Sequence, residues 1–220
     1  MKTTNTSAET LIVTVLVAPF VYLGLCWSQL PAEIATHFDL HGHADGWMPK
    51  EKAALLVGVT SVIFYLVLRF LPRIDPKVRL QSSNYQKLRF VITLGFAAIM
   101  GWMWYRSGHQ ANEQQSYGAM LAIIGLLLAG IGNYMTTVKP NWFIGIRTPW
   151  TLQNETVWRK THRLGGRLMV VGGLLSAVLA LVVPTPYTEV SVVGVILLTS
   201  LIPVVYSYIY FQQEKAHQLN

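Results

Sequence analysis

Six long apolar segments set the strongest limit on what this chain of 220 residues can fold into. Each is close to the roughly 20 residues with which an α-helix crosses the hydrocarbon core of a bilayer, about 30 Å thick. The predicted spans are residues 10–28, 53–71, 88–105, 117–138, 164–183 and 190–211. Helices satisfy their own backbone hydrogen bonds in lipid, and the short alternating segments of a membrane barrel are absent. The sequence therefore predicts an all-α membrane protein, a six-helix transmembrane bundle.

The distribution of Lys and Arg predicts how this bundle is oriented. Hydrophobic residues make up 52% of the chain and charged residues only 12%, which is too apolar for a soluble globule. The basic residues gather around the second connection (Arg69, Arg73, Lys77, Arg79, Lys87 and Arg89) and in the fourth (Lys139, Arg147, Arg159, Lys160, Arg163 and Arg167). Short basic loops stay in the cytoplasm, so both termini are predicted inside and loops one, three and five outside. Anionic lipid accounts for the net charge of +7, and direct binding of nucleic acid is not expected.

The first outer loop, residues 29–52, contains an alternation of His and Asp. Its Pro and Gly residues predict a compact segment of turns rather than a helix. In an extended conformation Asp39, His41, His43 and Asp45 would point to one side, and with His37 they could bind zinc or another divalent ion. The alternative is that His37 and Asp45 hydrogen-bond turns within the loop while His41 and His43 are exposed. In that case no cofactor is expected.

The connection between the fourth and fifth spans, residues 139–166, is unusually rich in tryptophan. Thr151 or Asn154 can cap a short helix whose first turn holds Glu155, placed favourably at the positive end of the helix dipole. Such an amphipathic helix would rest several aromatic side chains in the inner headgroup layer, namely Trp142, Phe143, Trp150 and Trp158. Alternatively the loop is only an elbow between two spans. Arg147 and His162 could also line a binding site, because polar residues among aromatic ones often orient a ligand or partner.

Small residues mark the fourth and fifth spans. They are Gly125, Ala129, Gly130, Gly132, Gly165, Gly166, Gly172 and Gly173. Small side chains let helix backbones approach closely, which suits a tight bundle within one chain. A homodimer interface is the alternative.

Two kinds of activity find little support in the sequence. Apart from residues at their ends, the predicted spans contain no Asp, Glu, Lys, Arg or His, which ion-coupled transporters usually carry at mid-membrane. The chain also has no zinc-protease His pair, no serine nucleophile elbow and no phosphate-binding glycine loop ending in Lys. No catalytic residue is therefore assigned, and transport of a small solute ranks third among the functions considered.

Both loops resemble known families. The inner tract from Gly145 to Leu152, followed by Asn154, Glu155, Trp158, Thr161 and His162, resembles the signature of the SdpI family of membrane immunity proteins. The outer tract resembles a small domain of unknown function, DUF1648, through Pro31, His37, Phe38, Gly42, Asp45, Gly46, Trp47 and Lys50. These resemblances divide the chain into residues 1–71, with the DUF1648-like loop, and an SdpI-like four-span region, residues 72–220, with its signature loop at 139–166.

The resemblance implies a multi-pass protein of the bacterial cytoplasmic membrane that confers resistance to a secreted, membrane-active toxin peptide and is not an enzyme. It further implies that such a protein can hold a cytoplasmic winged-helix repressor at the membrane. From the predicted topology and the positions of the two motifs, we expect the outer loop to meet the toxin and the inner loop to meet the repressor. The outer residues predicted to face the toxin are His37, Phe38, Asp45, Trp47 and Lys50. The inner residues predicted to bind a partner or ligand are Asn141, Gly145, Arg147, Thr148, Pro149, Trp150, Thr151, Asn154, Glu155, Trp158 and His162. A metal-binding membrane enzyme or sensor built on the outer loop is the alternative function.

Overall fold

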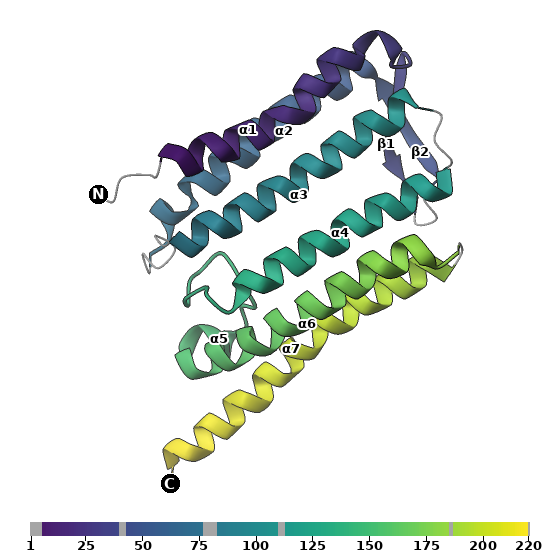
Figure 1. The fold of residues 1–220 in the computed structure, drawn as a ribbon. Helices are drawn as coiled ribbons and strands as arrows, with labels where there is room; N and C mark the ends of the chain where they lie inside the picture. Colours follow the sequence, from purple (N-terminus) through teal and green to yellow (C-terminus); the bar gives the residue numbers. More distant parts are fainter. Residues whose placement is uncertain (1–5, 40–42, 77–82, 110–112, 185–186, 220) are drawn as a thin grey trace.

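Six long helices dominate the computed structural model, which describes residues 6–39, 43–76, 83–109, 113–184 and 187–219 (Figure 1). They are α1 (Thr6–Cys26), α2 (Lys50–Ile74), α3 (Ser83–Gly108), α4 (Glu113–Met135), α6 (Glu155–Val182) and α7 (Tyr187–Leu219). All six are long and apolar enough to cross a membrane. The prediction of an all-α, six-helix bundle is confirmed, and the protein is a multi-pass membrane protein.

The two loops singled out in the sequence lie at opposite ends of the bundle (Figure 1). After a 3-10 turn at Trp27–Gln29, the first loop forms an antiparallel hairpin of β1 (Glu33–Phe38) and β2 (Ala44–Pro49). We call this end the hairpin end. The short helix α5 (Pro149–Gln153) lies at the other end, where α1 begins and α7 ends. We call it the loop end.

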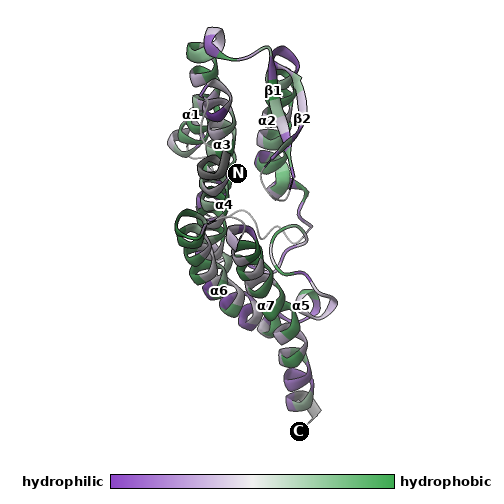
Figure 2. Ribbon diagram, turned by 90° about the vertical axis from the view of Figure 1, so that its right-hand side faces the viewer, coloured by the Kyte–Doolittle hydropathy of each residue, from purple (hydrophilic) through white to green (hydrophobic). Residues whose placement is uncertain are grey.

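Apolar side chains cover the outside of the bundle, as expected for a protein whose solvent is lipid. Large hydrophobic residues such as Leu55, Val62 and Leu181 are more than half exposed. Figure 2 shows hydrophobic residues along the length of the helices and hydrophilic ones near the C-terminal end of α7. Such a surface would be costly in water, because each buried Å² of apolar area is worth roughly 25 cal/mol.

Close contact between α4 and α6 explains the small residues of these two spans. A Cβ atom on Gly125 would lie 2.7 Å from the carbonyl oxygen of Gly173, and one on Gly166 would lie 2.8 Å from that of Gly132. On the other side of α6, a Cβ on Gly172 would lie 2.2 Å from Thr199 of α7. These glycines therefore pack within the chain, which is the first of the two alternatives considered for them.

The beginning of α6 differs from the prediction. The helix expected as a separate amphipathic segment is the first part of α6, which runs without a break from Glu155 instead of starting at residue 164. Its basic side chains lower the hydropathy of these turns without interrupting the helix. Trp158 is only 1% exposed, so it packs inside the protein and not in a headgroup layer. The separate short helix is α5, which lies before Asn154.

Candidate functional site

The side chain of Asn141 makes hydrogen bonds to the backbone of the signature loop, residues 139–166. The Oδ1 atom of Asn141 accepts hydrogen bonds from the backbone N–H groups of Phe143 (2.8 Å) and Ile144 (2.7 Å). Its Nδ2 atom donates to the carbonyl oxygens of Lys139 (2.9 Å) and Ile144 (3.0 Å). The side chain is fully buried, so these bonds use its polar atoms without water. Asn141 therefore shapes the loop and does not present itself to a partner.

Gly145 and His162 meet at the centre of the loop. Gly145 has φ +113°, a conformation that favours glycine, and a Cβ there would lie 2.2 Å from Nε2 of His162. The backbone N–H of Ile146 donates to this Nε2 (3.0 Å), so the ring is neutral and carries its hydrogen on Nδ1. Nδ1 donates to the carbonyl oxygen of Trp158 (2.8 Å), and the two rings stack at 3.9 Å. The buried His162 thus joins the loop to α6.

Thr148 and Thr151 form a capping box around α5. The Thr151 hydroxyl accepts from the Thr148 N–H (2.9 Å) and donates to the Ile146 carbonyl (2.9 Å), while Thr148 Oγ1 accepts from the Thr151 N–H (3.3 Å). Pro149 occupies the first turn of α5, where its missing N–H costs nothing. Thr151 and Asn154 were the two candidate N-caps of the helix whose first turn holds Glu155. Thr151 instead belongs to the box of α5 and is fully buried.

Asn154 caps α6, as the sequence predicted. Its Oδ1 accepts from the N–H groups of Thr156 (2.8 Å) and Val157 (3.1 Å). We expect Asn154→Ala to destabilise the protein by about 1 kcal/mol, which lowers the thermal unfolding midpoint by about 2–4 °C. Exposed Gln153 provides the matched control, because Gln153→Ala removes no cap and should change the midpoint little. Equal midpoints for the two variants would contradict the capping role.

Two of the loop's tryptophans are anchored in the protein. Trp150 Nε1 donates to Ser207 Oγ of α7 (2.7 Å), and its ring meets the Tyr208 ring edge-on at 5.3 Å. Trp158 Nε1 donates to the Val138 carbonyl oxygen (2.8 Å). Both indole N–H groups are therefore used inside the chain. Their role is to fix the signature loop onto α6 and α7.

An exposed part of the loop remains, and we call Trp142, Arg147 and Pro149 the loop tip. Trp142 is 48% exposed. Arg147 is exposed as well, and its Nη1 donates a hydrogen bond to the carbonyl oxygen of Trp142 (2.5 Å). Glu155, at the start of α6, is exposed as well. A partner can meet a large aromatic surface beside a guanidinium group here. Arg147 and Pro149 of the loop tip were predicted as partner residues, whereas Trp142 was not. Most of the other predicted inner residues fold the signature loop.

The hairpin is fixed to the bundle by its inward side chains. Ile34 is 1% exposed and packs in a cluster with Leu30 and Trp104. Phe38 meets Trp102 of α3 edge-on, at 5.8 Å between ring centroids. Lys50 Nζ, at the start of α2, donates to the carbonyl oxygens of Trp27 (3.2 Å) and Leu30 (3.4 Å). Phe38 and Lys50, both predicted to face a toxin, therefore hold the hairpin in place.

The outer face of the hairpin presents His37, Asp45 and Trp47. Trp47 is 58% exposed. His37 Nδ1 and Asp45 Oδ1 lie 2.5 Å apart and form a pair that is open to solvent. Gly46 lies opposite His37 in the strand register, and a Cβ on it would come within 2.9 Å of the His37 Cβ. The chain therefore needs glycine at position 46 to bring the two strands together.

The predicted metal ligands fall into two separate pairs. His37 pairs with Asp45, while Asp39 accepts from the backbone N–H of His43 (2.8 Å) and lies 3.4 Å from its Nδ1. His41 lies outside the described residues. Within the described part of the chain, no group of three or more His, Cys, Asp or Glu side chains could hold a metal ion. The metal site stays an untested prediction.

A cluster of charged side chains that was not predicted from the sequence lies at the loop end. Glu9 of α1 accepts two hydrogen bonds from Arg89 of α3, both 2.8 Å, and lies 2.5 Å from Nη1 of Arg69 of α2. The Tyr65 hydroxyl also donates to Glu9 (2.5 Å). Arg89 is 2% exposed, and its Nε has no hydrogen-bond partner among the described residues. We call Glu9, Tyr65, Arg69 and Arg89 the charged cluster, and it ties three helices together.

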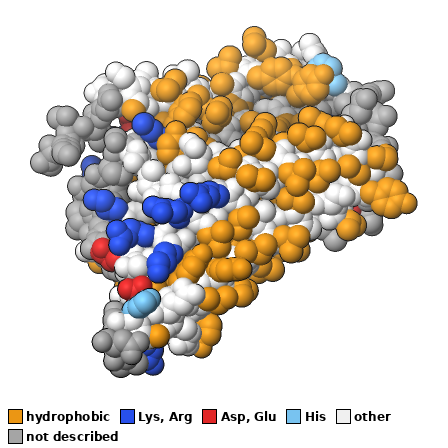
Figure 3. Space-filling model, turned by 60° about the horizontal axis from the view of Figure 1, so that its bottom comes forward, with side chains coloured by type: hydrophobic (Ala, Val, Ile, Leu, Met, Phe, Trp, Pro, Cys, Tyr) orange, Lys and Arg blue, Asp and Glu red, His pale blue; other side chains and the backbone are white. Residues whose placement is uncertain are grey.

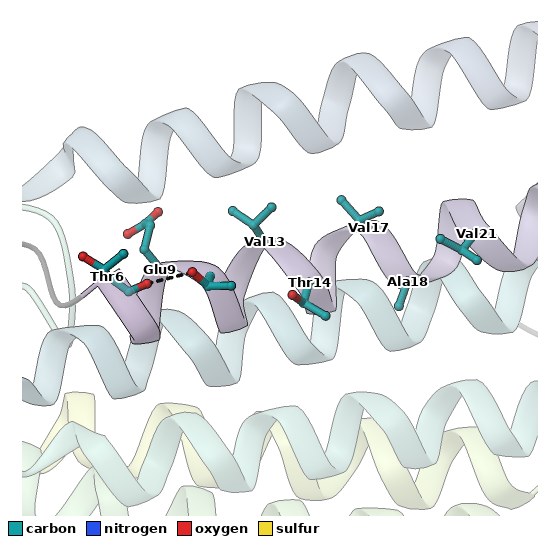
Figure 4. Close-up of a pocket in the computed structure, with 8 residues that line it drawn as sticks. Thr6, Glu9, Val13, Thr14, Val17, Ala18 and Val21 are labelled. Atoms are coloured by element: carbon teal, nitrogen blue, oxygen red, sulfur yellow. Dashed lines mark hydrogen bonds between the residues drawn. The ribbon is translucent and has the colours of Figure 1, made fainter.

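The charged cluster adjoins a hollow along α1 of about 690 Å³. Figure 4 shows its lining, with Thr6 and Glu9 at one end and Val21 at the other. Glu9 directs its carboxylate to the two arginines, so the hollow offers mainly an apolar surface. Glu9 lies in the first turn of α1, which agrees with the expectation that ionisable groups occur only at the ends of the spans.

Comparisons with known proteins agree with both resemblances. Residues 137–207 match the SdpI/YfhL protein family, and residues 14–61 match the domain of unknown function DUF1648. The chain is similar to the Immunity protein SdpI of Bacillus subtilis (strain 168), with 27% identity over 194 residues, which are 86% of this chain and 88% of the relative. No solved structure matches the chain. The resemblances predicted from the two loops are confirmed.

Proposed function

From its SdpI-type signature loop and its DUF1648-type hairpin, we propose that this protein is an immunity protein of the bacterial cytoplasmic membrane. It protects its host from a secreted, membrane-active toxin peptide without an enzymatic reaction. The observation that carries the proposal is that the two loops lie at opposite ends of the bundle (Figure 1) and that each exposes a tryptophan, Trp47 in the hairpin and Trp142 in the signature loop. Such an arrangement suits a protein that meets one partner on each side of a membrane.

The charge distribution supports an orientation with the loop end in the cytoplasm. On the face brought forward in Figure 3, Lys and Arg side chains gather at the loop end, beside a broad hydrophobic surface. Cytoplasmic loops carry an excess of Lys and Arg. Both described chain ends also lie at the loop end, as six crossings require. The hairpin then faces the outside, where a secreted toxin arrives.

The hairpin offers a toxin peptide one exposed indole beside a polar pair. Trp47 supplies a large apolar surface with a single hydrogen-bond donor, and such residues dominate the energy of many interfaces. The neighbouring His37 and Asp45 add polar contacts without closing a cavity. Because Phe38 and Lys50 fix the hairpin to the bundle, this surface is held in one conformation before the toxin binds.

The loop tip is the surface that we assign to a cytoplasmic repressor. Trp142 and Arg147 combine an aromatic face with a positive charge, and both residue types are enriched at interfaces. The charged cluster links α1, α2 and α3 at this same end. Apolar contacts at the hairpin end and the charged cluster at the loop end therefore tie these three helices together at both of their ends.

A protection assay with two tryptophan variants tests the proposal. Expressed in a toxin-sensitive bacterium, the protein should raise survival, and Trp47→Ala should reduce that protection at least tenfold by removing an interface anchor. Trp142→Ala is the matched control, since Trp142 is similarly exposed (48% against 58%) but lies at the loop end. It should keep protection at equal membrane levels. No protection by the wild-type chain, or equal losses in both variants, would refute the assignment.

Substitutions in the loop tip should affect toxin-induced signalling and leave survival unchanged. If it holds a repressor after toxin is sensed, Trp142→Ala and Arg147→Ala should abolish toxin-induced expression of a reporter placed under the gene's own promoter. Survival should stay near the wild-type level, because the hairpin is intact. Full reporter induction in both variants would remove the loop tip from signalling.

A further inference from the structure

Three arginines follow one another along the exposed face of α6 at the loop end. Arg159, Arg163 and Arg167 are spaced four residues apart, so they lie one above the other on the helix, and all three are exposed. We call them the arginine ladder. The ladder belongs to the beginning of α6, at the loop end, where Figure 3 shows Lys and Arg side chains beside a broad hydrophobic surface.

Repulsion between its own positive charges makes the arginine ladder unfavourable for the stability of α6. Like charges four residues apart on a helix repel each other. Glu155 lies four residues before Arg159 and can offset that charge, but α6 has no Asp or Glu three or four residues away from Arg163 or Arg167. The adjacent Lys160, in contrast, has Glu214 of α7 at 3.6 Å. An external anion that covers the ladder would remove this repulsion.

The same helix face becomes apolar immediately beyond the ladder. Val171, Leu174 and Val178 continue the spacing of Arg163 and Arg167 and are 66%, 50% and 57% exposed. One face of α6 therefore offers positive charge and then a track of aliphatic side chains. An anionic head joined to a hydrocarbon chain complements both parts, whereas an acidic protein domain would complement only the first.

We propose that this face of α6 binds an anionic phospholipid of the leaflet at the loop end. The guanidinium groups of Arg163 and Arg167 bind the phosphate, for which their planar, forked donors are well suited. An acyl chain lies along Val171, Leu174 and Val178. The bound lipid fixes the depth of α6, and with it the signature loop, relative to the membrane surface.

Lipid titration of the purified full-length protein tests this site. In detergent, native mass spectrometry should show tighter retention of phosphatidylglycerol than of phosphatidylcholine. The double variant Arg163→Gln with Arg167→Gln should weaken phosphatidylglycerol binding by about 30-fold, from two lost phosphate contacts. The matched control is Lys160→Gln with Lys215→Gln, which removes the same charge at the same end but lies off the ladder. It should bind like the wild type.

Several results would overturn the proposal. Equal affinity for the two lipids, or unchanged phosphatidylglycerol binding in the double variant, would show that the ladder does not select an anionic lipid. Inorganic phosphate that displaces the lipid at equal concentration would show that the aliphatic track contributes nothing. If the double variant kept its lipid but lost the toxin-induced reporter response, the ladder would be a protein-docking surface instead.

Discussion

Replacing Glu9 by Gln should lower the free energy of unfolding by about 3 kcal/mol, the lower end of the cost of breaking a buried ion pair, because the Glu9 side chain is still 17% exposed. The neutral amide would leave two arginines of the charged cluster without a counter-ion, and Arg89 is only 2% exposed. Both Glu9 oxygens accept hydrogen bonds from Arg89, so the substitution also removes half of that bidentate contact. Thermal unfolding of the detergent-purified variant measures the effect, and a large drop in midpoint is expected.

Two further variants separate this effect from a general loss of charge. Glu214→Gln removes the acid of a more exposed pair, Lys160–Glu214, and should cost less than about 1 kcal/mol. Glu9→Met combined with Arg89→Met removes the buried pair as a unit and should recover most of the stability, because apolar replacements avoid the desolvation cost. If Glu9→Gln and Glu214→Gln were equally mild, the charged cluster would not hold the helices together.

Gly145→Ala should destabilise the signature loop by about 3 kcal/mol or more, seen as a fall of about 6–12 °C in the unfolding midpoint. An alanine at φ +113° is strained, and its Cβ would lie 2.2 Å from His162 Nε2. Relief requires the ring to move, which breaks the hydrogen bond from the Ile146 N–H. The loop tip should then lose its arrangement, and toxin-induced reporter expression should fall.

Gly24→Ala provides the control for this glycine. Nothing lies within 4 Å of a Cβ placed on Gly24, which is in the helix α1, so the midpoint should stay or rise slightly. A second change, His162→Ala in the Gly145→Ala background, should recover little stability, because the histidine's own hydrogen bonds are lost with the clash. An unchanged midpoint for Gly145→Ala alone would contradict the geometry at the centre of the loop.

Hydropathy predicted the number of helices but not all of their boundaries. Apolar windows locate the middle of a span, where lipid requires hydrophobic side chains. At the loop end the helices leave the hydrocarbon, and polar residues continue them without any change in backbone structure. Glu9 in α1 and Arg159 and Arg163 in α6 were left out of the predicted spans for this reason.

The sequence motifs located the candidate site but did not reveal what each residue does. Motif positions such as Asn141 and Thr151 carry hydrogen-bonding groups that suit a ligand as well as a loop. Only their burial and their backbone partners show that they fold the signature loop. The DUF1648-like tract likewise indicated a compact loop, whereas its hairpin depends on strand pairing with bulges around His37.

Contacts between residues that are far apart in the sequence could not be predicted either. Glu9 and Arg89 are 80 positions apart, and a single sequence contains no signal that joins them. Polar residues near the ends of spans are common as interfacial groups, so neither residue stood out. Their contact follows from the packing of α1 against α3, which depends on the whole bundle.

Cysteine labelling tests most directly the claim that the hairpin and the signature loop lie on opposite sides of the membrane. Cys26 is buried and is replaced by Ala, after which Glu33→Cys and Gln153→Cys each introduce one exposed thiol. With a membrane-impermeant maleimide on intact spheroplasts, the thiol at position 33 should react at once. The thiol at position 153 should react only after the membrane is opened. Labelling of both thiols from the same side would contradict the account.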